Sequence, residues 1–158
     1  MRRLTALLAL VLIGAAPLSD GRRAFDFEIG RWTMAPSGYG HEVQRLWDGG
    51  TIGRLEIPAP KPHVAGSMLK VYSAATRRWS LYWADATDGT VSPPLVGTFA
   101  GGRGTFTGRD TVRGRPLLVR LVYFDIDHAS FKTQQSVSRD AGKTWKPGPV
   151  QTYTRTST

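Results

Sequence analysis

The sequence predicts an all-β protein in which about eight to ten antiparallel strands close into one up-and-down barrel. Short apolar or alternating runs recur along the chain, each separated from the next by turn residues. The 158 residues include 18 glycines and 10 prolines, which interrupt extended segments too short to form long helices. Successive short strands with local connections would leave open sheet edges, and closing the sheet removes them.

Alternation is clearest in 79–83, 117–124 and 131–137, where side chains of one type recur at every second position. Glycine pairs such as Gly101-Gly102 suit tight hairpins, whereas the proline-rich segment 58–66 predicts one long irregular loop. A helix fits only the apolar N-terminal run or a short turn around 22–29. The strands are expected at 30–36, 40–47, 51–57, 67–74, 78–84, 94–100, 103–109, 115–124, 129–138 and 148–155.

The N-terminus has the pattern of a secretory signal peptide. Arg2 and Arg3 precede the apolar run 4–13, and small residues follow. About ten apolar residues are too few to span ~30 Å of hydrocarbon. We therefore expect a signal peptide at 1–19, a linker at 20–24 and one barrel domain at 25–158, giving an exported protein, periplasmic or secreted, that is not an integral membrane protein after cleavage. Without cysteine, the domain must depend on its apolar core rather than on disulfides.

The formal net charge is +9, but the basic residues are scattered rather than clustered. Scattered charge favours a solvated basic surface over nucleic-acid binding, and an exported protein rarely meets nucleic acid. An anionic partner such as a lipid or an envelope polymer remains an alternative. The sequence leaves the oligomeric state open.

The two ends of the chain carry residues suited to closing a barrel. Gly30 and Trp32 open the first strand, and Arg155 lies near the end of the last. In a meander barrel these strands meet, so the Arg155 guanidinium is expected to lie across the Trp32 ring and to donate to nearby carbonyls. This G-x-W pattern with a late arginine resembles the structural signature of the lipocalin and fatty-acid-binding superfamily.

A longer resemblance runs through most of the domain. Segments 25–32, 72–83, 93–99 and 138–145 resemble a family of exported bacterial proteins of uncharacterised function with a lipocalin-like (calycin) barrel. The resemblance implies that fold and no established activity or site. The chain departs from the family at 147–149, where Pro-Gly-Pro stands in place of an aromatic residue, which bears on the pairing of the last strand.

Residues 138–145 also match the Asp-box hairpin of sialidases. In such a hairpin the aspartate accepts hydrogen bonds from turn N–H groups, glycine adopts a positive φ, and tryptophan packs beneath. A single copy cannot build a propeller, whose blades repeat at a fixed period. We therefore assign a structural hairpin role to Ser138, Asp140, Gly142 and Trp145.

The most informative polar residue is Arg120, at the centre of the apolar strand 115–124. On an outer face it would be solvated. On an inner face it would need a partner, such as a ligand carboxylate or phosphate, Glu42 or Glu56. The candidate ligand-binding set adds one polar neighbour and three aromatic walls to this arginine, although the aromatic residues also fit an ordinary core: Gln135, Trp83, Tyr123 and Phe131.

No catalytic motif is recognisable. The chain has no nucleophile elbow, and the spacing of Glu28, Glu42 and Glu56 does not require them to pair. His41 and Glu42 are adjacent in a strand and point to opposite faces, so no metal site and no cofactor are predicted. The first hypothesis is an exported barrel that binds a small apolar or anionic amphipathic ligand. The alternatives are a non-catalytic envelope interaction or structural module with a filled barrel, and a cavity-based hydrolase or isomerase.

Overall fold

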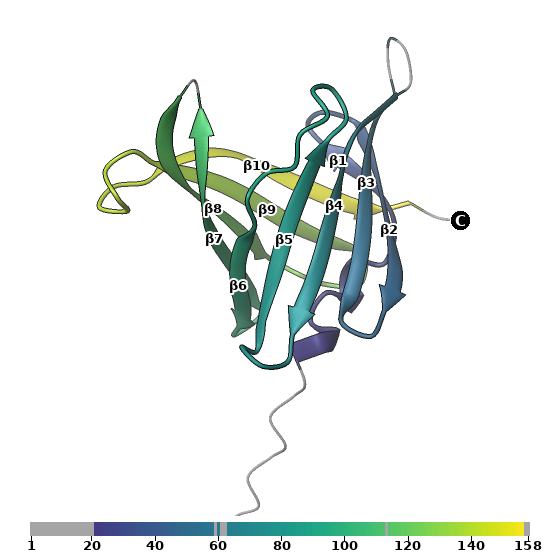
Figure 1. Cartoon of the computed structure of the whole chain (residues 1–158). Helices are drawn as coiled ribbons and strands as arrows, with labels where there is room; N and C mark the ends of the chain where they lie inside the picture. Colours follow the sequence, from purple (N-terminus) through teal and green to yellow (C-terminus); the bar gives the residue numbers. More distant parts are fainter. Residues whose placement is uncertain (1–20, 59, 61–62, 113, 157–158) are drawn as a thin grey trace, which may run out of the picture.

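The computed structural model describes residues 21–58, 60, 63–112 and 114–156. The predicted signal peptide lies outside the described residues. The remaining chain forms ten antiparallel strands in one closed barrel (Figure 1), each paired with its neighbours in sequence, and β1 with β10. The strands are β1 (Gly30–Ala35), β2 (Tyr39–Trp47), β3 (Gly50–Ile57), β4 (His63–Ser73), β5 (Arg78–Asp85), β6 (Leu95–Ala100), β7 (Arg103–Val112), β8 (Arg115–Phe124), β9 (Ser130–Ser138) and β10 (Lys146–Arg155).

The predicted all-β, lipocalin-like barrel is confirmed, and the proline-rich segment differs from the prediction. The predicted irregular loop at 58–66 is shorter than expected, because β4 already begins at His63. His63 pairs with Ile57, and Val64 pairs with Glu56, after a register shift between Leu55 and Glu56. Because of that shift, the pairing of β3 with β4 extends further than the prolines in 58–66 predict. Among the described residues, no helix is long and apolar enough to cross a membrane.

The barrel closes where the sequence predicts. Trp32 of β1 pairs with Arg155 of β10, and the Arg155 guanidinium lies 4.0 Å from the centroid of the Trp32 ring. Gly30 has a φ of +126°, and a β-carbon there would lie 2.5 Å from the guanidinium, so glycine leaves the room that Arg155 needs. Arg155 also donates hydrogen bonds at 2.7–2.8 Å to three backbone carbonyls, those of Phe27, Ile29 and His128.

The core fills the end of the barrel at which the N-terminal segment enters. Residues 21–24, expected to be a linker, instead pack against the barrel, because Phe25 is fully buried and holds them there. The N-terminal segment, residues 21–28, contains two short 3-10 helices, η1 (Gly21–Arg23) and η2 (Asp26–Glu28). The Phe25 ring meets the Trp79 ring edge-on at 4.9 Å. The buried aromatic and aliphatic cluster consists of Phe25, Trp32, Trp79, Leu81, Phe106, Tyr123 and Phe131.

The predicted hairpin between β9 and β10 is also present. One carboxylate oxygen of Asp140 accepts from the Thr144 backbone N–H at 2.9 Å, and the other accepts from the Thr144 hydroxyl. Gly142 has a φ of +90°, and the Trp145 indole donates to its carbonyl at 3.1 Å. Ser138 completes the turn by accepting from the Gly142 N–H at 2.8 Å. Beyond this hairpin the β9–β10 register shifts between Pro147 and Val150, in the segment that departs from the resembled family.

Glycine is sterically required at Gly97 of β6. A β-carbon there would run into the carbonyl oxygen of Thr105 and lie 2.8 Å from the Cα of Phe106, and neither backbone atom can move aside easily. We expect Gly97→Ala to lower the free energy of unfolding by about 3 kcal/mol, measured by urea denaturation. Gly40→Ala is the matched control, because its β-carbon would meet Glu56 only at an ordinary 3.7 Å. Equal stability of the two variants would contradict this view of Gly97.

Candidate functional site

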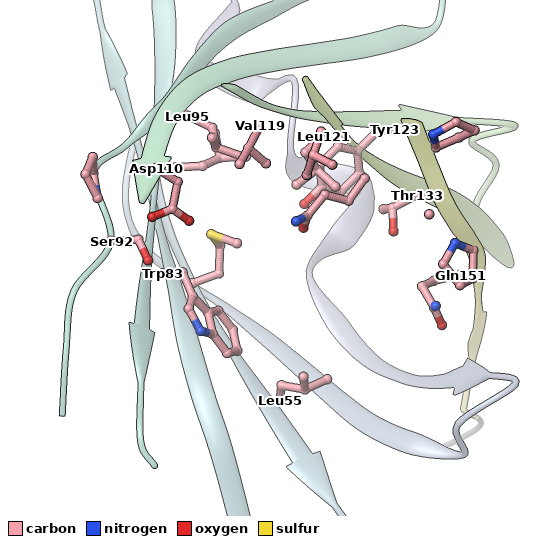
Figure 2. Close-up of a pocket in the computed structure, with 18 of the residues that line it drawn as sticks. Leu55, Trp83, Ser92, Leu95, Asp110, Val119, Leu121, Tyr123, Thr133 and Gln151 are labelled. Carbon is pink, nitrogen blue, oxygen red and sulfur yellow. The ribbon is translucent and has the colours of Figure 1, made fainter. Parts of the chain in front are cut away.

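A cavity of about 860 Å³ occupies the barrel above the packed core. Its walls are inward-facing side chains, which alternate along each strand with outward-facing ones. Figure 2 shows Trp83 and Leu55 on one side of this space and Val119 and Leu121 across from them. The apolar wall consists of Leu55, Met68, Leu81, Trp83, Leu95, Val119, Leu121 and Val137.

Three of the predicted ligand-binding residues line this cavity, and a fourth lies below it. Trp83, Tyr123 and Gln135 belong to the lining. Phe131 is instead fully buried in the core, stacked on the Tyr153 ring at 4.4 Å and edge-on to the Trp32 ring at 4.8 Å. Phe131 therefore supports the cavity wall through Tyr153, which lines the space, and is not itself part of the lining.

The hypothesis that Arg120 points into the barrel is wrong. Its neighbours Val119 and Leu121 line the cavity, so the alternation of the strand turns Arg120 outward. There its guanidinium lies 4.1 Å from the centroid of the Trp145 ring. Strand β8 is apolar on both faces because the β9–β10 hairpin places Trp145 against its outer side.

The polar groups at the floor of the cavity come from three separate elements. Glu28 ends η2, His41 lies in β2 and Lys70 lies in β4. One oxygen of the Glu28 carboxylate lies 3.1 Å from His41 Nε2, and the other pairs with Lys70 Nζ. The Glu28 side chain is 2% exposed and that of Lys70 is 0% exposed, so this is a fully buried ion pair. Gly53 leaves room for the histidine, since a β-carbon there would lie 2.8 Å from His41 Cε1.

These surroundings shift the pKa values of the groups at the floor. Burial alone would raise the pKa of Glu28, but the charge of Lys70 and the hydrogen bond with His41 outweigh it and lower this pKa from 4.5 to about 2. Burial lowers the pKa of Lys70, and Glu28 opposes that shift. Burial also raises the pKa of Tyr153 to about 12 and that of Tyr123 well above its usual range, so both phenols keep their protons.

The lowered pKa of Glu28 predicts a specific loss of stability in acid. The folded-state pKa lies below the unfolded one, so its contribution is complete above pH 4.5 and disappears as the pH falls through 2. The shift is equivalent to about 3 kcal/mol. We compare the unchanged protein with the double variant Glu28→Gln/Lys70→Met. Between about pH 5 and pH 2, the free energy of unfolding of the unchanged protein should fall by about 3 kcal/mol more than that of the double variant. Urea denaturation at a series of pH values measures this difference, and parallel pH profiles would contradict the prediction.

Two acceptor-capable atoms at the cavity have no hydrogen-bond partner among the described residues. They are His41 Nδ1 and Gln151 Oε1, both buried, and both residues belong to the cavity lining. Figure 2 places Gln151 on the same side of the cavity as Thr133. Buried polar atoms are normally paired, so these two mark a place where a partner is expected.

The mouth of the cavity is polar and mainly basic. Arg109, Arg139 and Lys146 belong to its lining and are exposed, and Asp110 is the acidic residue among them. They come from β7, from the β9–β10 hairpin and from the start of β10. The lining therefore changes from charged at the mouth to apolar along the wall and to hydrogen-bonding at the floor.

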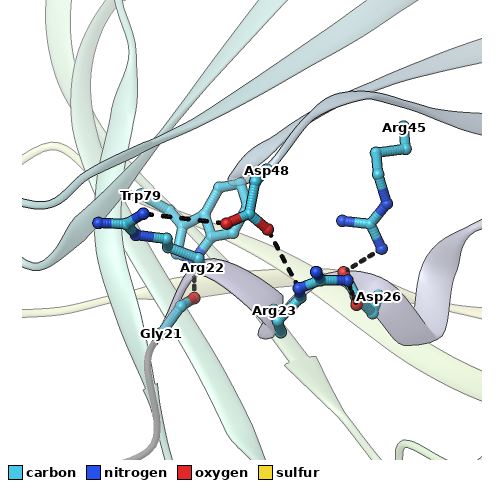
Figure 3. Close-up of polar contacts among 7 residues, drawn as sticks. All are labelled: Gly21, Arg22, Arg23, Asp26, Arg45, Asp48 and Trp79. Carbon is cyan, nitrogen blue, oxygen red and sulfur yellow. Dashed lines mark hydrogen bonds and ion pairs between the residues drawn. The ribbon is translucent and has the colours of Figure 1, made fainter.

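The opposite end of the barrel is closed by the N-terminal segment. The Trp79 indole donates to the Gly21 carbonyl at 2.8 Å, and Arg23 lies 3.1 Å from the Asp48 carboxylate (Figure 3). Arg45 of β2 lies 2.8 Å from Asp26 of η2. These contacts tie the segment to the barrel and thereby hold Glu28, which follows Asp26 by two residues, under the cavity.

Sequence reasoning missed the buried pairing of Glu28 with His41 and Lys70, and also missed Gln151. A usable signal exists for Lys70, which shares the period-two face of Met68 and Tyr72 in a strand without other charges. Glu28 has no such signal, because it precedes the first strand and its position depends on how the N-terminal segment folds back.

No protein-family model and no curated protein matches this chain. The resemblance to exported barrel proteins therefore gains no support from these comparisons, and the fold assignment rests on the strand topology. Among the described residues, no group of three or more histidine, aspartate or glutamate side chains is placed to hold a metal ion.

Proposed function

We propose that this protein binds a small, mostly apolar molecule inside the barrel, with an anionic group at the mouth. The observation that carries the proposal is the cavity of about 860 Å³. Ligand cavities typically measure about 300–1,000 Å³ and combine apolar walls with a few polar groups. A barrel serving only as a structural module would be filled by its own side chains, so the volume favours binding over that alternative.

The lining also supports the orientation of the ligand. Arg139 and Lys146 at the mouth suit a carboxylate, sulfonate or phosphate, because both are basic and an arginine can donate two hydrogen bonds to one such group. The apolar wall beneath would cover the body of the ligand. In this proposal the protein acts outside the cytoplasm, after residues 1–19 have been removed.

Anilinonaphthalene sulfonate, an apolar anion that fluoresces when shielded from water, is a suitable first probe. We expect saturable binding that weakens at least about tenfold in Leu121→Trp, because the larger side chain occupies the cavity. Fluorescence titration with direct excitation of the probe measures both affinities.

Thr107→Trp is the matched control for that titration. Thr107 is exposed on β7, where the same new side chain adds surface without entering the barrel. Equal affinities of Leu121→Trp and Thr107→Trp, or no saturable binding to the unchanged protein, would overturn the proposal.

A further inference from the structure

The floor of the cavity presents hydrogen-bond acceptors without donors. His41 Nδ1 and Gln151 Oε1 are buried and have no partner in the part of the chain that the structure describes. The His41 side chain is 9% exposed, and both residues line the cavity. A buried acceptor without a donor costs free energy, and a bound molecule that supplies the donor recovers it.

The contact with Glu28 sets which ring nitrogen of His41 faces the carboxylate. The Glu28 carboxylate is held ionised and lies 3.1 Å from Nε2, so it accepts the Nε2–H hydrogen bond. In the neutral form of the ring, this contact places the proton on Nε2 and leaves the lone pair on Nδ1.

We propose that this floor binds an uncharged hydrogen-bond donor, a hydroxyl group, at the inner end of the ligand. An anionic group would face the lone pair of His41 Nδ1 and the charge of Glu28. A cationic group would find that carboxylate already paired with Lys70. A hydroxyl donates one hydrogen bond and adds no charge to a buried site. This inference rests on the proposed function, since it names the chemistry at the inner end of the same cavity.

The side chains over His41 must move slightly for the ligand to reach it. Nδ1 is closed off from water in this structure, although its residue lines the cavity. Rotamer changes of this size are common when binding sites fill, while the backbone stays in place. The Tyr153 ring, which also lines the cavity, is a neighbour of the His41 ring at 5.4 Å between centroids.

A medium-chain primary alcohol and its methyl ether test the inference, because they share an apolar body and only the alcohol has a donor. Both are titrated as competitors of anilinonaphthalene sulfonate. We expect the alcohol to bind about tenfold more tightly than the ether. In His41→Phe, which keeps a ring but has no acceptor, the ratio should fall to about one. His63→Phe carries the same substitution at an exposed position on β4 and should keep the tenfold ratio.

Nitrogen NMR of the unchanged protein provides a second readout that does not depend on the folding of a variant. Addition of the alcohol should shift the His41 Nδ1 resonance in the direction of a hydrogen-bonded lone pair, and addition of the ether should not. Equal affinities for alcohol and ether, with probe binding intact, would overturn the donor site and leave the binding proposal standing. Failure of the probe itself to bind would overturn both.

Discussion

Replacement of Lys70 by methionine should lower the free energy of unfolding by about 3–5 kcal/mol, because it leaves the Glu28 carboxylate buried without its cation. Lys70 is fully buried, with its ammonium group 4.7 Å from the centroid of the Phe25 ring, so water cannot take its place without opening the core. Urea denaturation near neutral pH measures the loss. Protonation of Glu28 in the variant should also make it less sensitive to acid than the unchanged protein.

Two comparisons separate this effect from the loss of a lysine in general. Lys132→Met removes the cation of an exposed pair with Asp125, at 2.9 Å, and should cost less than about 1 kcal/mol. The double variant Glu28→Gln/Lys70→Met removes both charges and keeps an acceptor for His41, so it should recover most of the stability lost in Lys70→Met. A Lys70→Met variant as stable as Lys132→Met would show that the buried pair does not contribute in this way.

Arg155→Met should lower the free energy of unfolding by about 3 kcal/mol, because three backbone carbonyls at the barrel seam lose their charged donor. Arg155→Lys should recover little of this loss, since an ammonium group cannot reach the three carbonyls from one position. Thermal or urea denaturation measures both variants.

Arg120→Met is a close control for this second prediction. The Arg120 guanidinium also lies on a tryptophan, at 4.1 Å from Trp145, compared with 4.0 Å between Arg155 and Trp32. Removing the Arg120 contact should cost about 1 kcal/mol or less. Equal losses in Arg120→Met and Arg155→Met would assign the effect of Arg155 to stacking alone and not to the seam carbonyls.

The fold could be predicted from the sequence more completely than the site, and strands β8 and β4 show the physical reason. Alternation and turn residues locate a strand, which is why 115–124 was predicted with the bounds of β8. A strand that is apolar on both faces does not reveal which face is inside, so the sequence left the orientation of Arg120 open. The inward position of Lys70 agrees with its pairing with Leu81, a buried residue of the neighbouring strand.

The interior site was harder to predict because it joins elements that are distant along the chain. Glu28 reaches His41 and Lys70 only because the N-terminal segment folds back under the barrel, held by Phe25. Neither period-two patterning nor residue spacing carries that information. The barrel closure was predictable because its chemistry is local to each end of the chain: Gly30 and Trp32 at one, Arg155 at the other.

The pairing of β1 with β10 also constrains when this protein can fold during its synthesis. Trp32 and Arg155 are neighbours in space but lie near opposite ends of the barrel's sequence. The seam between β1 and β10 therefore cannot form until β10 has left the ribosome. Contacts of such long sequence separation form slowly, because most of the chain must be ordered before they contribute. A nascent chain that ends before residue 146 therefore has β1 and β9 without the strand that lies between them, and the barrel cannot close until β10 has been synthesised.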